Sequence, residues 1–218
     1  MSIEHLLKWV LNVFELTAAC TGFYYWNKWK HTYWKWFTIF LFFIFLTEMV
    51  GKYLATYVPG TNVRWYRYVN IPVYFLFLLW LLGKPFQTKR MLSISQFFMI
   101  GYIALFLAEE LLLSGSNVKY SILSYQFGSV AILVLSIKYF IRLVQKDSIL
   151  FFKSDIHFWV SSGLIIYMII MLPFRSLYNI LDTHNYHSIA TGYWYLSFLF
   201  NYNMYTFFTL GLIWGKAK

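Results

Sequence analysis

The stretch that decides the fold is FTIFLFFIFL, residues Phe37–Leu46, in which one polar side chain, Thr38, interrupts nine apolar ones. A transmembrane β-strand alternates apolar and polar residues, and this stretch does not. A helix that crosses a hydrocarbon core about 30 Å thick needs about 20 mostly apolar residues, and the apolar run extends over Trp36–Tyr57. The stretch therefore predicts a membrane-spanning helix.

The composition of the whole chain agrees with this prediction. Of its 218 residues, 60% are hydrophobic and only 12% are charged, whereas soluble domains are about 45–50% apolar and about 25% charged. The excess apolar surface must face lipid. A single cysteine, Cys20, excludes an intrachain disulfide and a cluster of several cysteines around a metal.

Seven apolar stretches are long enough to cross a membrane. They are His5–Trp26, Trp36–Tyr57, Tyr68–Gly83, Met91–Leu113, Ser121–Val144, Ile156–Tyr178 and Thr191–Gly215. The third is short and needs the aromatic residues at its start as an interfacial anchor. Because the connecting loops are too short for a second domain, we expect an all-α polytopic membrane protein with one seven-helix domain over residues 1–218.

The distribution of lysine and arginine predicts the orientation of the chain. The side that holds the loops after helices one, three and five and the C-terminus carries twelve of these residues, and the other side carries six. Positive residues are retained in the cytoplasm, so we expect an outer N-terminus and a cytoplasmic C-terminus. The net charge of +10 is thus a topology signal rather than a sign of nucleic-acid binding. Anionic lipid headgroups are the expected partners of the inner basic residues.

Ionisable residues at membrane depth are costly unless they are paired or hydrated. Glu15 lies about 15 Å into the first helix at about 1.5 Å per residue. Glu48 lies just past the middle of the second helix, and Lys52 follows one turn later on the same face. The Glu48–Lys52 pair is either a structural ion pair or part of a binding site, and the sequence leaves both open.

Further polar residues are expected at the outer ends of the helices. Glu109 and Glu110 are adjacent and point about 100° apart, so they do not form a catalytic pair by themselves. Arg175 in the sixth helix is a candidate partner for either glutamate. In the seventh helix, Asn201 and Asn203 either bond to neighbouring helices or face a cavity.

These residues predict a ligand site in the outer half of the bundle. Its candidate members are Glu48, Lys52, Glu109, Arg175, Asn201 and Asn203, with Glu15 as a separate polar group inside the membrane. No catalytic residue, metal site or cofactor is predicted. His184 and His187 are spaced His-x-x-His with Asp182 nearby, but a loop gives such a trio little of the fixed geometry that a metal site needs. No phosphate-binding loop or nucleophile elbow is present.

Several short motifs resemble a known family. They are EMVG at Glu48–Gly51, FWVSSG at Phe158–Gly163 with Tyr167, and the segment Asn201–Trp214. They are similar to a poorly characterised family of small bacterial seven-helix inner-membrane proteins, often encoded beside sensor histidine kinases. The chain departs from that family at Ile71–Val73, where the family has a more acidic stretch. The resemblance implies a membrane sensor or accessory role.

Three functions follow as expectations. The first is a sensory or signalling accessory protein that binds a ligand, or a membrane or cytoplasmic partner protein, through a polar cavity in the outer half. The second is an intramembrane enzyme or proton-coupled transporter that uses Glu15 or Glu48, since a buried carboxylate suits proton transfer. The third is a defence-associated accessory or pore protein. No second catalytic group is placed beside either glutamate by spacing, so the sequence favours a role without catalysis.

Overall fold

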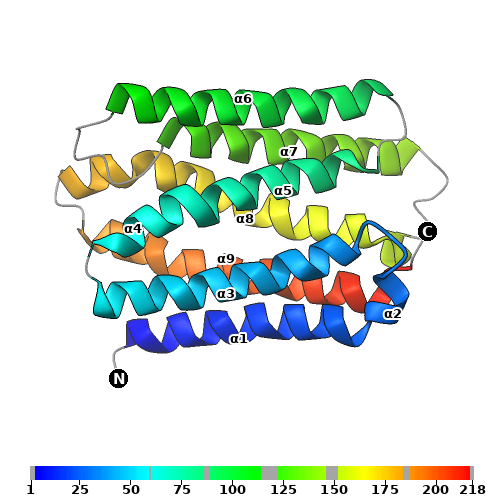
Figure 1. Ribbon diagram of the computed structural model, residues 1–218, viewed down its shortest axis with the longest axis horizontal. Coiled ribbons are helices and arrows are strands. Elements are labelled where there is room, and N and C mark those ends of the chain that lie inside the picture. The colour runs from blue at the N-terminus through cyan, green and yellow to red at the C-terminus, as the bar shows by residue number, and fades with distance from the viewer. Residues whose placement is uncertain are drawn as a thin grey trace. The chain divides into compact units, whose positions relative to one another are not determined.

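The computed structural model describes residues 3–58, 60–85, 89–113, 122–145, 152–183 and 187–216. Within these residues the chain is helical and contains no strand. The elements are α1 Ile3–Tyr24, α2 Trp26–Trp29, α3 Lys35–Tyr57, α4 Thr61–Trp65, the π-helical turn η1 Tyr66–Asn70, α5 Ile71–Gly83, α6 Lys89–Leu113, α7 Ile122–Gln145, α8 Ile156–Thr183 and α9 His187–Trp214 (Figure 1).

Within the residues that the structure describes, six stretches of helix are long and apolar enough to cross a membrane, so the chain is a multi-pass membrane protein. They are His5–Tyr24, Lys35–Tyr57, Thr61–Gly83, Ile94–Leu112, Leu123–Gln145 and Ile156–Phe174. Each coincides with one of the seven predicted stretches. α9 coincides with the seventh, but it is rich in tyrosine and asparagine and is not among the six.

The third predicted stretch is longer than expected. The helix begins at Thr61 rather than Tyr68 and continues through α4, η1 and α5 to Gly83. Pro72 explains the π-helical turn η1 in the middle of this helix. Proline has no N–H to donate to the carbonyl four residues earlier, and its ring crowds that carbonyl. The backbone instead widens, and the Ile71 N–H bonds to the Tyr66 carbonyl five residues earlier.

The chain divides into two compact units. Unit 1 contains residues 1–45 and 136–218, and unit 2 contains residues 46–135. α3 and α7 each contribute residues to both units. The single seven-helix domain expected from the sequence stays a prediction.

In unit 1, α9 packs beside both α8 and α1 (Figure 1). Two glycines allow the close approach of α8 and α9. A Cβ on Gly163 would lie 3.2 Å from the Met204 carbonyl oxygen, and one on Gly211 would lie 2.8 Å from the Trp159 Cβ. Small residues at such crossings are typical of membrane helices.

In unit 2, the core is built on the apolar face of α5. Phe75 is fully buried and packs against Tyr102 of α6 and Tyr125 of α7, with ring centroids 5.3 Å and 5.0 Å away. Gly128 of α7 makes room for the Phe75 ring, which lies 2.5 Å from where a Cβ would be. This packing holds α5 and its preceding π-turn in place.

Candidate functional site

Glu48 is the centre of the first part of the site. Its carboxylate accepts a hydrogen bond of 2.7 Å from the Tyr66 hydroxyl and a longer one of 3.5 Å from the Asn70 side-chain amide. The same amide donates to the Thr47 hydroxyl at 3.0 Å. A half-buried carboxylate in a helix long enough to cross the membrane thus has two donors from η1.

Lys52 adds a favourable charge interaction with Glu48 from one helical turn away. The sequence left open whether Glu48 and Lys52 form a structural ion pair or part of a binding site, and in the structure Glu48 also accepts hydrogen bonds from η1. The donors from η1 lie 18 and 22 residues from Glu48, so no local pattern could have revealed them.

Gly51 makes the Tyr66–Glu48 contact possible. A Cβ at position 51 would lie 2.5 Å from the Tyr66 hydroxyl oxygen and 2.7 Å from the ring carbon that bears it. Trp65 adds a further link to the same helix by donating its indole N–H to the Thr47 carbonyl at 3.1 Å. The close packing partner of Gly51 is therefore Tyr66.

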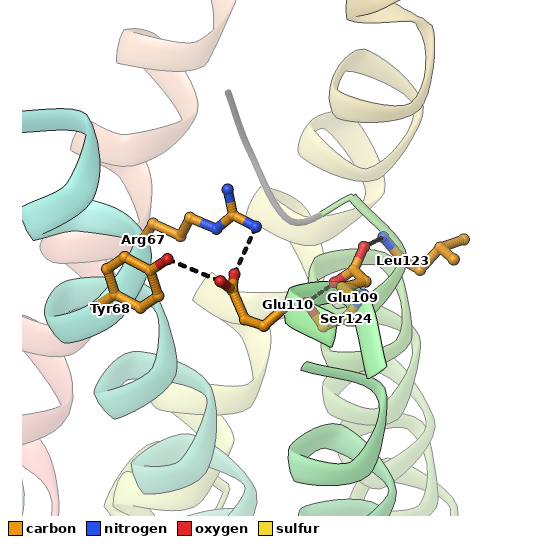
Figure 2. A network of polar contacts seen from close by, with 6 residues as sticks. All are labelled: Arg67, Tyr68, Glu109, Glu110, Leu123 and Ser124. Atoms are coloured by element: carbon orange, nitrogen blue, oxygen red, sulfur yellow. Dashed lines mark hydrogen bonds and ion pairs between the residues drawn. The ribbon is translucent and has the colours of Figure 1, made fainter. Parts of the chain in front are cut away.

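Glu110 of α6 forms the second part of the site. Its carboxylate is paired with Arg67 at 2.5 Å and accepts a hydrogen bond of 2.7 Å from the Tyr68 hydroxyl (Figure 2). The Arg67 guanidinium also lies 5.7 Å from the centre of the Tyr68 ring. Arg67 is not among the site residues predicted from the sequence, because its partner Glu110 lies far along the chain on α6.

Four of the five side chains of η1 therefore hold carboxylates on two different helices. Tyr66 and Asn70 face Glu48 of α3, and Arg67 and Tyr68 face Glu110 of α6. We call these six residues the π-turn network. π-helical turns inside α-helices frequently mark functional sites, and this network is the best candidate in unit 2.

Glu109 has a structural partner instead. Its carboxylate accepts hydrogen bonds from the backbone N–H groups of Leu123 at 2.6 Å and Ser124 at 3.0 Å, and from the Ser124 hydroxyl. Figure 2 shows Glu109 and Glu110 pointing to opposite sides, as their 100° offset predicts. Glu109 thus caps the first turn of α7, where unbonded N–H groups favour a negative charge.

The predicted polar residues of α9 bond along their own helix. Asn201 donates to the Ser197 carbonyl at 2.8 Å, and Asn203 donates to the Leu199 carbonyl at 3.0 Å. The Arg175 side chain lies outside the described residues, so its pairing stays a prediction. Glu15 is buried in α1 with 2% of its surface exposed.

Among the described residues no group of three or more histidine, cysteine, aspartate and glutamate side chains could hold a metal ion. His184 lies outside these residues, as do the side chains of Asp182 and His187. The expectation for this loop therefore stays a prediction.

The sequence missed a buried polar cluster in unit 1. The Tyr33 hydroxyl and the His157 Nε2 are hydrogen-bonded at 2.5 Å, and the Trp34 ring packs 4.4 Å from the imidazole. Burial, and next the nearby charge of Asp155, raise the pKa of Tyr33, so at neutral pH this hydroxyl stays protonated; the tautomer of His157 sets which of the two groups donates. Asp155 also accepts from the His157 backbone N–H at 3.0 Å, which starts α8. The Asp155–His157 spacing could have predicted that cap, but nothing local indicates Tyr33.

No protein-family model, curated protein or solved structure matches the chain.

Proposed function

We propose that this chain is a sensory or signalling accessory protein of the bacterial inner membrane that responds to a ligand or partner at the π-turn network. It crosses the membrane seven times, with its N-terminus outside and its C-terminus in the cytoplasm. α9, the seventh span, has 28 residues and is about 42 Å long at about 1.5 Å per residue. Because α9 packs against α1 and α8, part of its surface does not face lipid. This packing supports the proposal that α9 crosses the membrane although its hydropathy is lower than that of the other spans.

The observation that carries the proposal is that one turn of helix holds the carboxylates of two others. A change in the partners of Arg67 alters the position of η1, and the same turn supplies both donors to Glu48. An event at the exposed edge of the network is thereby transmitted from α6 to α3. Such a two-sided contact suits a sensor better than a catalyst.

The chemistry of this edge indicates an anionic ligand group. Arg67 pairs with Glu110 while 15% of the arginine side chain and 24% of the glutamate side chain remain exposed. A carboxylate or phosphate from outside competes with Glu110 for the guanidinium, which binds both groups in the same forked geometry. Arg64, which is exposed on α4, adds positive charge nearby.

The output of the protein goes through a separate chain or the lipid surface. The twelve basic residues predicted on the cytoplasmic side include Lys138, Arg142, Lys146 and Lys153. Anionic headgroups are attracted to such residues, and a docked partner protein would meet the same charges.

The test uses Trp65 as a reporter, because its indole donates to Thr47 beside Glu48. The protein is labelled with 5-fluorotryptophan in nanodiscs, and the Trp65 resonance is assigned with Trp65→Phe. We expect Glu110→Gln, which releases Arg67, to move this resonance, and succinate or inorganic phosphate to move it in the wild type but not in Arg67→Gln. Arg142→Gln is the matched control. A Trp65 resonance unchanged by Glu110→Gln would show that η1 does not connect the two carboxylates, and the proposal would fail.

A second candidate is a proton-coupled transporter or intramembrane enzyme that uses Glu15 or Glu48. The burial of Glu15 in α1, with 2% exposed, favours it. Proton flux in proteoliposomes under a pH gradient separates the two functions. The accessory role predicts the flux of empty liposomes, whereas flux that is lost in Glu15→Gln or Glu48→Gln would establish transport. Planar-bilayer conductance of the same preparation tests the pore function.

A further inference from the structure

The outward side of α9 carries residues at an alternating spacing of four and three. They are Gly192, Leu196, Leu199, Asn203, Thr206, Leu210 and Ile213. Leu196 and Leu199 are 44% and 51% exposed. This spacing averages 3.5 residues, which is the repeat along the seam of two helices that wrap around each other with a left-handed twist.

The other sides of α9 are occupied within unit 1. The Tyr202 hydroxyl donates to the Leu7 carbonyl of α1 at 2.8 Å. Phe208 packs edge-on against Phe37 of α3, and Gly211 faces Trp159 of α8. The seam residues therefore lie on the side of α9 that points away from its neighbours in this unit.

Asn203 is the unusual member of the seam. It lies near the middle of α9, and its amide donates one hydrogen bond, to the Leu199 carbonyl. A primary amide has a second N–H and a carbonyl oxygen, and in the described part of the chain the Asn203 side chain makes no other hydrogen bond. At the centre of a membrane span such groups are costly unless another helix supplies partners.

A second copy of this chain supplies matching partners. An amide is both donor and acceptor, so two asparagines at the same depth complement each other. All copies insert in the same direction, so two α9 helices run parallel about a two-fold axis and place Asn203 opposite Asn203. A single asparagine in an otherwise apolar seam is the known device that fixes register and a two-stranded state.

The rest of the seam permits the approach. Gly192 has open space where a Cβ would be, with nothing within 4 Å. Thr206 is exposed and its hydroxyl is bonded to the Tyr202 carbonyl of its own helix at 2.7 Å, so it brings no unmet polar group to the seam. Small residues let membrane helices pack closely.

We propose that the protein is a parallel homodimer in the membrane, joined along the α9 seam with the two Asn203 side chains hydrogen-bonded to each other. This inference rests on the proposed function in one respect, namely that α9 is the seventh span. It places the dimer contact in unit 1, whereas the π-turn network belongs to unit 2.

Disulfide trapping in native membranes tests the contact. In a Cys20→Ser background, Leu199→Cys and Thr206→Cys lie on the seam, and the exposed residues Val13→Cys of α1 and Ile100→Cys of α6 are matched controls. Copper phenanthroline is expected to produce dimers of twice the chain mass for the two seam variants and not for the controls. Equal trapping at all four positions, or none on the seam, would overturn the dimer. A cross-linked band of another mass would show that a different protein occupies the seam and would overturn it as well.

Fluorescence energy transfer between labelled copies, measured while proteoliposomes are diluted with lipid, tests the role of Asn203. We expect Asn203→Leu to weaken the dimer about threefold to thirtyfold, with Asn203→Gln between it and the wild type. An unchanged dimer in Asn203→Leu would refute the asparagine pair.

Whether α9 crosses the membrane is tested separately, by labelling Thr191→Cys and Lys216→Cys with a membrane-impermeant maleimide. Labelling from opposite sides establishes that α9 spans, so that absent trapping then counts against the dimer alone. Labelling of both from one side would refute the seventh span, and the seam with it.

Discussion

Gly51→Ala is the most direct test of how α3 holds the π-turn. The new methyl group would lie 2.5 Å from the Tyr66 hydroxyl oxygen, well inside contact distance. Either the Tyr66 ring moves and loses its 2.7 Å bond to Glu48, or the two helices shift apart.

The size of the effect follows from three contributions. Overpacking costs about 1–3 kcal/mol, and loss of a hydrogen bond to a charged group costs about 1.5–3 kcal/mol. Only one of these two costs applies, because a movement of the Tyr66 ring that breaks its hydrogen bond also removes the overlap with the new methyl group. Alanine is the better helix former by about 1 kcal/mol, so we expect a net loss of up to about 2 kcal/mol in the free energy of unfolding.

The assay is unfolding in mixed micelles by titration with dodecyl sulfate, followed by circular dichroism. Gly51→Ala is compared in the wild type and in Tyr66→Ala, where the overlap is absent and the substitution should stabilise by up to about 1 kcal/mol. Ala55→Gly, at an exposed alanine of the same helix α3, is the control for helix propensity alone. If Gly51→Ala has the same effect in both backgrounds to within about 0.5 kcal/mol, the residues do not interact as described.

Three further predictions concern single contacts and use the same unfolding assay or hydrogen exchange. Glu109→Ala should cost about 1–3 kcal/mol because three donors at the start of α7 lose their acceptor, and a loss below about 0.3 kcal/mol would contradict the cap. The pKa of Tyr33 is raised in the folded state, so its contribution to the free energy of unfolding is complete below the unfolded-state pKa of about 10 and declines as the pH rises above that value. Tyr33→Phe should reduce this decline, and the same pH dependence of unfolding in both proteins would contradict the prediction. The Lys28 ammonium donates to two carbonyls at the end of α9, at 2.9 Å and 3.3 Å, so Lys28→Met should speed amide exchange in the last turn up to about fivefold. Exposed Lys30→Met is the control, and equal exchange in both variants would count against the cap.

The helices of this protein could be predicted from sequence because lipid imposes a length and an apolar composition on each span. The continuous run at Phe37–Leu46 defines α3 without reference to any other part of the chain. The third span was predicted too short, because its first residues include Arg64 and Arg67, which break the apolar pattern. Arg67 is accommodated in the helix by its pairing with Glu110, and Arg64 is exposed.

The candidate site was predictable only in part, and the reason is again physical. Burial at membrane depth singles out Glu48 from sequence alone, whereas its donors depend on how another helix packs. Tyr66 and Asn70 gave no signal, since aromatic residues near a membrane boundary are ordinarily read as interfacial anchors. Glu109 was assigned to a ligand site, yet its partners are the N–H groups of a helix that begins 13 residues later.

The π-turn also has a consequence for helix phase. One extra residue in a turn rotates everything before it by about 100° relative to everything after it. The apolar residues of α5 can therefore point into the core of unit 2 while Tyr66 and Asn70 point at Glu48. Deletion of one residue within Tyr66–Asn70 would leave a span of nearly the same length but would rotate the residues before the turn by about 100°, away from both carboxylates. In this span, a change of a single codon would separate membrane insertion from the arrangement of the site.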